Sequence, residues 1–575
     1  MSKGLVICIF SFALLSCGSA DNAQDSPNAI SGQKIKKSDG EQTKILVNQI
    51  GFLPQQHKLA VIKSEQSQKF SVINADTREV VFEGTSSAPK LWPYSDEIVS
   101  IADFSEVSVA GNYLITVNNE VSSVTFGIEE EVYSDIHDAG IKAYYFNRAG
   151  MALDKSYAGK WQRSAGHPDT QVMVHSSAAT KERPEGTVLS SPKGWYDAGD
   201  YNKYIVNSGI TTYTLMRAYI DNQNFYQNRD FNIPESGDQT PDLLDEILWN
   251  LDWMATMQDT DGGVYHKLTT LRFSPADMPE DTTKQRYVVA KGTSASLNFA
   301  AVLSVASRVF PEKREQYLQQ ARHAWQWALA NPDVKFKNPS DVSTGEYGDK
   351  TLTDEFAWAA AELFISTGED EYWQAFNQYK TKLATPSWSN TSLLGYFSIL
   401  ADQPKALADA DYQLVQNEFL SFAKSIKEED QASAYRVAMN KKDFVWGSNA
   451  VALNKASVLW HAWRLTDDTG YKDAALNLVD YVLGRNPVDI TYITGFGSRS
   501  PMHIHHRPSQ ADGIEDPIPG FVAGGAHSGQ QDKCSYPSKL PALSYSDTWC
   551  SYASNEIAIN WNAPFVYMMS SILAD

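Results

Sequence analysis

The spacing of apolar residues divides the chain into a strand-like part and a helical part. Between residues 43 and 128, short β-prone runs recur at intervals of about a dozen residues and are separated by turn residues such as Gly111-Asn112. They are Ile45–Val47, Leu59–Ile62, Phe70–Ile73, Val80–Phe82, Ile98–Ile101, Tyr113–Val117 and Ser123–Phe126. About seven short strands in this length predict an immunoglobulin-like sandwich.

From residue 129 onward the apolar period becomes helical. Leu243, Leu244, Ile247, Leu248, Leu251 and Met254 make one wide stripe, preceded by Pro241 and Asp242, which favour a helix start. Similar patterns predict helices over Asn207–Tyr219, Ser294–Phe310, Gln316–Ala330, Asp354–Ser366, Asp370–Leu383, Leu407–Lys427, Asn454–Leu465, Gly470–Leu483 and Asn555–Leu573. Residues 129–575 therefore predict one large helical domain, with paired helices in a toroid and long loops on one face.

The first residues read as an export signal. Lys3 precedes an apolar run, Leu5–Leu15, that is too short to span a membrane. The run ends Leu14-Leu15-Ser16-Cys17, which resembles the processing site of a bacterial lipoprotein. We expect residues 1–17 to be a lipoprotein signal ending at a lipidated Cys17, the alternative being an ordinary cleaved signal. Residues 18–42 are polar and predict a flexible tether, so the protein is expected to be exported and anchored to the bacterial envelope.

The net charge and the cysteines limit which partners and which covalent bonds are expected. The formal charge is −20, or −21 without residues 1–16, and no basic cluster stands out. This argues against nucleic acid or an anionic membrane surface as a partner. Cys534 and Cys550 are the two cysteines outside the signal region, and in an oxidising compartment they predict a disulfide, the alternative being two free thiols.

Three segments carry candidate chemistry. In Trp195-Tyr196-Asp197-Ala198-Gly199-Asp200-Tyr201, glycine lets two carboxylates face one point, and the flanking aromatic residues suit a sugar ring. Glu556 opens an apolar stretch where desolvation favours a protonated general acid. The alternatives are ordinary capping or first-turn acids. The tract His503-Ile504-His505-His506-Arg507 is spaced poorly for zinc and suits hydrogen bonding to sugar hydroxyls.

Together these segments resemble glycoside hydrolase family 9, and Val47-Asn48-Gln49-Ile50-Gly51-Phe52 resembles the opening of the immunoglobulin-like domain found in one branch of it. The resemblance covers about residues 43–575. It implies a multidomain protein, with an N-terminal immunoglobulin-like β-sandwich followed by an all-α (α/α)6 barrel that hydrolyses with inversion. It further implies Asp200 as general base, Asp197 as its helper in holding water, and Glu556 as general acid.

The resemblance also implies substrate and metal contacts. His505 and Arg507 would hydrogen-bond sugar, Trp446 would stack on a glucosyl unit, and Tyr196 and Tyr201 are further candidates beside the two aspartates. Asp354 and Glu355 match a calcium position, although the carboxylate expected after a later tryptophan is missing beside Trp388. No zinc is expected, because the stretch holding His167 and His175 has no cysteine.

The expected function is internal cleavage of a β-1,4-glucan, either cellulose-like or mixed-linkage, by a monomer that needs no cofactor for its chemistry. One alternative is an exo-acting cellodextrinase or glucosaminidase of the same family. The alternative from another class is a carbohydrate-binding surface lipoprotein without catalysis, which would have no use for a separated acid and base.

Overall fold

The computed structural model describes residues 43–575. The predicted signal, the lipidation of Cys17 and the tether lie outside the described residues. No helix between residues 43 and 575 is long and apolar enough to cross a membrane.

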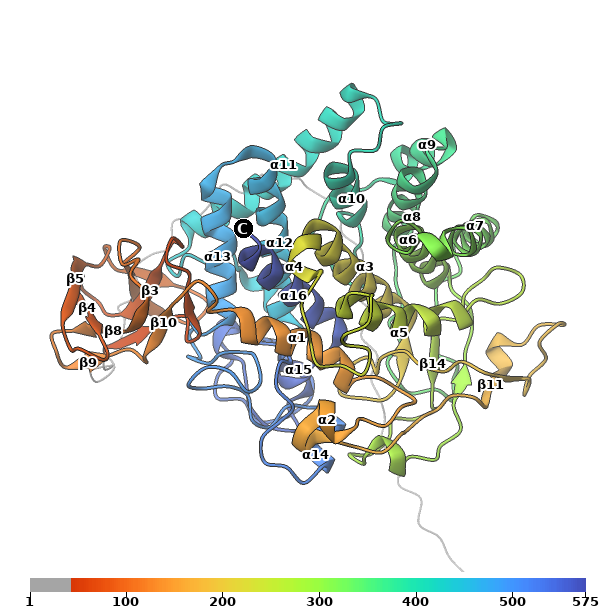
Figure 1. Cartoon of the computed structure of the whole chain (residues 1–575), viewed down its shortest axis with the longest axis horizontal. Helices are drawn as coiled ribbons and strands as arrows, with labels where there is room; N and C mark the ends of the chain where they lie inside the picture. The colour runs from red at the N-terminus through yellow and green to blue at the C-terminus, as the bar shows by residue number, and fades with distance from the viewer. Residues whose placement is uncertain (1–42) are drawn as a thin grey trace, which may run out of the picture. The chain divides into compact units, whose positions relative to one another are not determined.

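The N-terminal part is a sandwich of two β-sheets (Figure 1). The first sheet has the order β1 (Lys44–Leu46), β3 (Leu59–Lys63), β7 (Glu97–Asp103) and β6 (Lys90–Trp92). The second has the order β2 (Gly51–Phe52), β10 (Phe126–Ile128), β8 (Gly111–Val117), β4 (Lys69–Asn74) and β5 (Val80–Thr85), with β9 (Val121–Ser122) on β8. Phe52, Phe104 and Phe126 pack edge-on or tilted in the core between the sheets. The predicted sandwich is confirmed, and the strands missed by the pattern have only two or three residues.

The helical part is a double ring. Neighbouring inner helices pack in the order α12 (Ser448–Thr466), α16 (Ile559–Leu573), α3 (Ile205–Asp221), α6 (Thr293–Val309), α8 (Thr353–Thr367) and α10 (Leu394–Asp402). Outer partners are α13 (Thr469–Val482), α1 (Ser134–Phe146), α5 (Asp242–Thr256), α7 (Arg314–Ala330), α9 (Asp370–Tyr379) and α11 (Asp409–Ala432). Because α11 contacts both α10 and α12, it closes the ring. Six inner and six outer helices make the expected (α/α)6 barrel.

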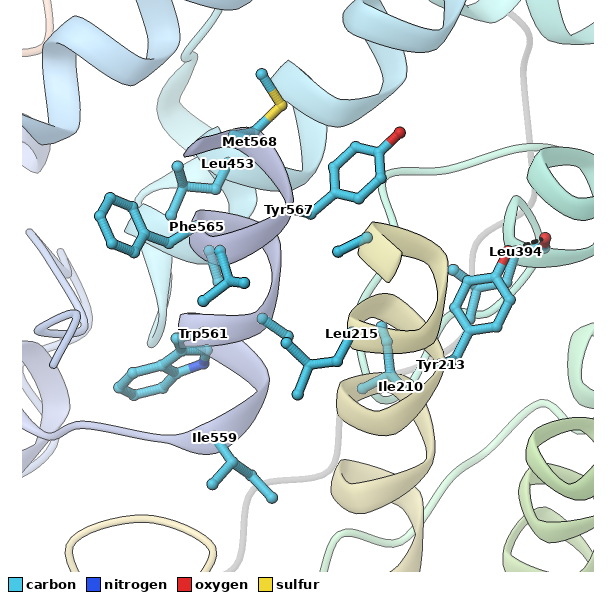
Figure 2. Packing of buried hydrophobic residues seen from close by; sticks show 14 of the residues in the cluster. Ile210, Tyr213, Leu215, Leu394, Leu453, Ile559, Trp561, Phe565, Tyr567 and Met568 are labelled. Carbon is cyan, nitrogen blue, oxygen red and sulfur yellow. Dashed lines mark hydrogen bonds between the residues drawn. The ribbon is translucent and has the colours of Figure 1, made fainter. Parts of the chain in front are cut away.

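The inner helices are buried on nearly every side, and this explains why their apolar stripes are wide. Figure 2 shows α16 and α3 packed along their length, with Trp561 and Phe565 on one helix and Ile210 and Leu215 on the other. The Tyr213 hydroxyl donates a hydrogen bond to the carbonyl of Leu394 over 2.7 Å and so ties α3 to the start of α10. The ring is thus a continuous core that fixes where each inner helix begins.

The predicted helix over Asn555–Leu573 is wrong in its first residues. A short helix, α15 (Tyr552–Asn555), ends before Glu556, which has extended backbone angles, and α16 begins only at Ile559. Residues 556–558 instead pair with other segments in isolated bridges: His505 with Glu556, Ala523 with Ile557, and Ala198 with Ala558. Apolar periodicity could not reveal this break, because Ile557 and Ala558 are as buried as the helix that follows.

The β-sandwich packs directly on the helical ring. The Asn48 amide donates to Asp480 Oδ1 on α13 over 2.8 Å, and the Gln49 amide N–H donates to the Leu483 carbonyl over 2.9 Å. Trp92 on β6 stacks at a tilt on Tyr435, with ring centroids 4.3 Å apart. The residues that made the opening of this domain recognisable are therefore interface residues.

Candidate active site

The loops that enter the inner helices enclose a cavity of about 510 Å³. Because the inner helices run in the same direction, these loops gather at the end of the ring where the N-terminal helix dipoles favour negative charge. The lining residues belong to the entries of α3, α8, α10, α12 and α16 and to the loop after β14 (Lys267–Thr269). They include Asp200, Tyr204, Phe273, Tyr347, Trp388, Trp446, Glu556 and Trp561.

The Asp-Ala-Gly-Asp segment is not a helix cap. Tyr204 is the N-cap of α3, and the helix begins at Ile205, so Asp197 and Asp200 lie too far upstream to cap it. They sit instead on an irregular loop, whose Ala198 bridges to Ala558 beside the acidic Glu556. The capping alternative weighed for this segment is excluded.

Asp200 receives its hydrogen bonds on one oxygen. Its Oδ2 accepts from the side-chain amide of Asn202, from the Asn202 backbone N–H over 3.3 Å, and from the Tyr204 hydroxyl over 3.3 Å. Among the described residues, Oδ1 receives no hydrogen bond, and the side chain lines the cavity. This arrangement leaves Oδ1 available to accept a proton from a water in the cleft.

Asp197 is held behind Asp200. The Asn207 amide donates to both of its carboxylate oxygens, over 2.9 and 3.0 Å, and the Tyr347 hydroxyl donates to Oδ2 over 2.9 Å. Burial, followed by the neighbouring Asp200 charge, raises the pKa of Asp197 to about 8. Near neutral pH, Asp197 is therefore mostly protonated.

Glu556 lies on the extended link between α15 and α16. It is held from both sides, since the His505 N–H donates to the Asn555 carbonyl and the Gly524 N–H donates to the Glu556 carbonyl. Burial, followed by the charge of Asp200, raises the pKa of Glu556 well above its ordinary value. A carboxyl whose protonated form is favoured in this way is suited to act as a general acid.

Gly199 determines how closely the loop with Asp200 approaches the segments that hold His505 and Glu556. A Cβ at this position would meet the His505 carbonyl oxygen at 2.2 Å and Glu556 Oε1 at 3.1 Å. Only glycine lets the loop with Asp200 approach the Glu556 segment this closely. The glycine in the motif thus serves the approach of two backbones more than a tight turn.

His505 and Arg507 both hydrogen-bond to backbone carbonyl groups of neighbouring loops. His505 Nδ1 hydrogen-bonds to the Trp549 carbonyl over 2.8 Å, and burial lowers its pKa to about 4, so the ring is neutral with Nε2 as an acceptor. Arg507 donates from Nε to the Ser274 carbonyl over 2.8 Å and from Nη1 to the Gly199 carbonyl over 2.5 Å. Arg507 is therefore a clamp on the loop of Asp200, and neither residue lines the cavity.

The aromatic residues divide into two groups. Trp446 is 42% exposed and lines the cavity, as a sugar platform must. Tyr196 and Tyr201 are instead buried with Ala149, where the Tyr196 hydroxyl contacts His167 and the Tyr201 hydroxyl donates to the Asp277 carbonyl. Their position does not support the substrate contacts expected of them, and we assign them to the support of the loop.

The sequence did not single out several cleft residues, notably Asn207, Phe273, Tyr347, Trp388 (as a cleft residue) and Trp561. Tyr347 has a left-handed backbone with φ of 47°, and such strain in a non-glycine residue is typical of functional sites. Its hydroxyl reaches Asp197 from a loop 150 residues away. Of these residues, only Asn207 could have been suggested by the sequence, because it lies a few positions after the Asp-Ala-Gly-Asp motif.

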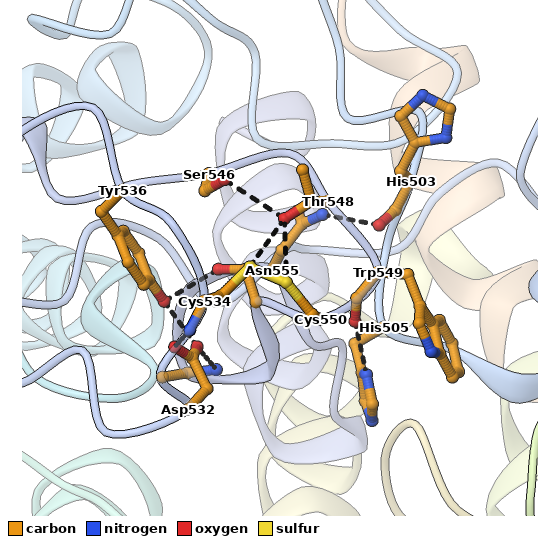
Figure 3. Close-up of a disulfide and its surroundings, with 12 residues drawn as sticks. His503, His505, Asp532, Cys534, Tyr536, Ser546, Thr548, Trp549, Cys550 and Asn555 are labelled. Atoms are coloured by element: carbon orange, nitrogen blue, oxygen red, sulfur yellow. Dashed lines mark hydrogen bonds between the residues drawn. A yellow bond between two sulfur atoms is a disulfide. The ribbon is translucent and has the colours of Figure 1, made fainter.

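The predicted disulfide is confirmed between Cys534 and Cys550, whose Cα atoms are 5.7 Å apart (Figure 3). The neighbouring Trp549 stacks on His505 with ring centroids 4.3 Å apart. Asp547 accepts from the N–H groups of Met502 and His503 and from the Asn555 side chain, over 2.8 to 3.0 Å. The disulfide thus closes a loop that supports both the histidine tract and the residue before Glu556.

The predicted calcium position has unused oxygen atoms. Both carboxylate oxygens of Glu355, Oδ1 of Asp354, Oδ2 of Asp349 and the Thr391 hydroxyl are buried without a hydrogen-bond partner among the described residues. Burial, followed by the charge of Asp354, raises the pKa of Glu355 well above its ordinary value. These all-oxygen donors suit a hard cation. No three carboxylate, histidine or cysteine ligands converge within residues 43–575, so Thr391 or backbone oxygens would complete the shell.

His167 and His175 are engaged within the protein. His167 contacts the hydroxyls of Tyr196 and Thr282 through its two ring nitrogens, and His175 contacts Ser177 and Asp341. The expectation that no zinc binds here stays a prediction.

Comparison with known proteins decides the family. The family model for glycosyl hydrolase family 9 matches residues 133–569, and that for the cellulase N-terminal Ig-like domain matches residues 40–122. The chain belongs to glycosyl hydrolase family 9. As a family 9 enzyme, it is 43% identical to a xyloglucan-specific endo-β-1,4-glucanase of Bacteroides ovatus, over 92% of this chain and 93% of that protein.

Two further matches agree with this membership. Endoglucanase D of Acetivibrio thermocellus is 32% identical, over 95% of this chain and 85% of its own length. A solved family 9 structure from Bacteroides ovatus has a TM-score of 0.87 and 42% identity, and it covers 92% of this chain and 98% of that one. The family 9 enzyme described here thus shares both of its parts, sandwich and barrel, with its relatives.

Proposed function

We propose that this family 9 hydrolase cleaves a β-1,4-glucan internally and with inversion. The observation that carries the proposal is the placement of Asp200 and Glu556 on one cavity lined by Trp388, Trp446 and Trp561. Asp200 Oδ1 would take a proton from water as that water attacks the anomeric carbon. Protonated Glu556 would give its proton to the leaving oxygen, and Asp197 would help to hold the water.

The substrate we favour is a glucan with side branches. The relative from Bacteroides ovatus is named as xyloglucan-specific. The cavity lining also includes small residues, which would leave room beside a glucan backbone for branches: Ala198, Gly345, Ser387, Ser389, Gly447, Ala450 and Ala558. Unbranched cellulose-like and mixed-linkage glucans remain the other candidates for the same site.

The first experiment compares tamarind xyloglucan, carboxymethyl cellulose and barley β-glucan. Viscosity and reducing ends are followed together in each. An early fall of viscosity identifies internal cleavage, whereas oligomer release with little loss of viscosity would support the exo-acting alternative. Binding without hydrolysis of any of the three would support the non-catalytic alternative.

The second experiment tests the roles of the carboxylates. Asp200→Ala and Glu556→Gln should each lower kcat by about 10²- to 10⁴-fold with smaller changes in KM. Proton NMR of fresh hydrolysate should contain the α-anomer first. The β-anomer appearing first would mean a covalent intermediate and would contradict the base role of Asp200.

We also propose that the enzyme acts as a monomer at the bacterial cell envelope, anchored through a lipid on Cys17. The sequence around Cys17 supports this proposal. Labelling of cells with a radioactive fatty acid should mark the wild-type protein and not Cys17→Ala. Equal labelling of both would exclude this anchor.

A further inference from the structure

A fully buried lysine lies behind the catalytic loop. Lys267 on β14 has no exposed surface. Its Nζ donates to Asn338 Oδ1 over 2.7 Å, to Thr344 Oγ1 over 2.9 Å and to the Gly345 carbonyl over 2.6 Å. All three acceptors belong to the segment that leads to Tyr347, and Gly345 itself lines the cavity.

Hydrogen bonds continue from this lysine to Asp200. Thr344 Oγ1 lies 2.7 Å from Thr269 Oγ1, which donates to Asn202 Oδ1 over 3.0 Å. The Asn202 side-chain amide in turn donates to Asp200 Oδ2. Every member is buried, with exposed fractions of 0% for Lys267 and Thr269, 3% for Thr344, 2% for Asn202 and 6% for Asp200.

The donors in this chain can all point the same way. An ammonium has only donors, so Thr344 accepts from Lys267 and can give its own proton to Thr269. The Thr269 hydroxyl can then share its proton between Asn202 Oδ1, at 3.0 Å, and the Thr270 carbonyl oxygen, at 2.7 Å. The Asn202 amide donates to the carboxylate. A chain that begins at a cation and ends at an anion, in a place with little water, polarises each bond and strengthens it.

The geometry at the end of the chain has a second effect. The Asn202 amide binds Oδ2, the oxygen that also receives the Asn202 N–H and the Tyr204 hydroxyl. The carboxylate is thereby prevented from turning, and Oδ1 stays toward the cavity. Thr270 N–H also donates to Asn202 Oδ1 over 3.0 Å, which fixes the amide itself.

We propose that Lys267 is a positioning residue for hydrolysis, which acts through Thr344, Thr269 and Asn202 to keep the Asp200 carboxylate ionised with Oδ1 facing the cleft. The inference rests on the proposed role of Asp200 as general base. The three carboxyl groups lie close together, since the charge of Asp200 contributes to raising the pKa of both Asp197 and Glu556.

Other titratable groups lie near Asp200 and Lys267 and contribute to the pH dependence of activity. The groups that face Asp200 or Lys267 from the neighbouring residues are Asp197, Tyr204, His266, Glu346, Tyr347, His505 and Glu556. Arg507 faces His505 and Glu556. Burial lowers the pKa of Lys267 to about 7, against the raising effects of Asp200 and Glu346. Its charge is therefore fullest on the acidic side of neutrality, where the base has to be kept ionised.

The first test removes the charge. Lys267→Met should move the acid limb of the kcat/KM profile to higher pH by about 0.5 to 1 unit, so that activity below the limb falls about 3- to 10-fold. Lys58→Met is the matched control, because Lys58 is an equally buried lysine of the β-sandwich that donates to the carbonyls of Pro54 and Gln56. The control should lower Tm without moving the limb.

The second test breaks the chain and keeps the charge. Thr269→Val removes the hydroxyl at nearly constant volume and should move the limb in the same direction by less, whereas Thr269→Ser should restore the wild-type profile. In Thr269→Val, the further change Lys267→Met should add little, because the link is already broken. This variant also keeps the proposal testable if Lys267→Met fails to fold.

Two results would overturn the proposal. One is that Lys267→Met leaves the acid limb of the pH profile in place and raises KM, which would mean that the lysine only orders the cavity wall. The other is full additivity of Lys267→Met and Thr269→Val. Failure of the proposed function looks different: Asp200→Ala would then keep near wild-type turnover and the same acid limb.

Discussion

At the scale of single residues, two carboxyl groups in one cavity have opposite surroundings. Asp200 collects three donors on one oxygen, and its other oxygen receives no hydrogen bond among the described residues. Glu556 lies partly buried near Asp197 and Asp200 and is held through its backbone, and its pKa is raised well above the ordinary value. One residue is therefore suited to accept a proton and the other to give one at the same pH.

This difference predicts how Glu556→Gln depends on the leaving group. The acid is needed only where the departing oxygen is a poor leaving group, so the variant should lose about 10²- to 10⁴-fold on a glucan. On an aryl cellobioside with an acidic phenol, the loss should be several-fold at most. Initial rates on the two substrates check this, and equal losses would exclude the acid role.

The raised pKa of Glu556 also predicts how the activity changes with pH. A general acid works while protonated, and the raised pKa of Glu556 extends that form to higher pH. Activity on glucan should therefore extend to higher pH than an ordinary glutamic acid would allow and fall as the pH rises through the folded-state pKa. On the aryl substrate, Glu556→Gln should lack this basic limb.

At the scale of elements, Glu556 belongs to a short arm that several weak supports keep in place. The arm is bounded by the Cys534–Cys550 disulfide on one side and by α16 on the other. Asp532 accepts from the Ala553 N–H over 2.9 Å and from the Tyr536 hydroxyl over 2.6 Å (Figure 3). Because α15 has a single turn, these contacts must replace the stability of a longer helix.

Cys550→Ser is expected to lower kcat as well as stability. The loop closed by the disulfide is worth about 3 kcal/mol in the chain-entropy account. In addition, its loss frees Trp549, on which His505 stacks, and a shift of about 1 Å at a catalytic group can cost on the order of 10²-fold in rate. Cys534→Ser should behave alike. Rates are to be measured well below the Tm of each variant, and a folded variant with unchanged kcat would contradict the expectation.

Elements were predicted where the chain follows one period for long enough. The stripe around Leu243–Met254 became α5, and the strands around Tyr113–Val117 became β8. The break at Glu556 was missed, because Ile557 and Ala558 are apolar and buried like the helix that follows, and residues 556–558 pair with segments distant in sequence. Similarly, Tyr347 reaches Asp197 through the fold alone. Motifs located the two carboxylates, while their supports depended on tertiary structure.

At the scale of the whole molecule, the sandwich supports the cleft indirectly. Trp92 and Tyr94 pack on Phe444, with ring centroids 6.1 and 5.8 Å apart. Phe444 lies two residues before Trp446, which lines the cavity. Aromatic pairs of this kind contribute about 0.5–1.5 kcal/mol beyond their buried area, so the first domain stabilises a loop of the second.

Trp92→Ala should therefore raise KM for glucan together with a fall in Tm. Truncation of a buried tryptophan costs about 3–5 kcal/mol, and the loosened loop would hold Trp446 less firmly. Phe70→Ala is the control, because Phe70 is buried in the sandwich core away from this contact. It should lower Tm while KM stays near wild type, and equal changes in KM would argue against a specific support.

Calcium should raise the Tm of the wild-type protein. We propose that Asp354 and Glu355 bind it with neutral oxygens nearby, since a ligand that binds only the folded state stabilises it by mass action. Melting with added calcium or with chelator measures the effect, and Glu355→Gln should reduce it. A Tm that is insensitive to calcium in the wild type would exclude the site.

The close approach at Gly199 has a consequence for engineering. Ala198 pairs with Ala558, and His505 pairs with Glu556, through main-chain contacts. The distance between base and acid is consequently fixed by the polypeptide backbone. Replacing Asp200 by glutamate would change that gap by one methylene step, about 1.5 Å at most, while the backbone stayed in register. The barrel is therefore a scaffold on which the distance between the two carboxyl groups can be changed by one methylene group at a time. The anomeric form of the product then reports the effect of each change.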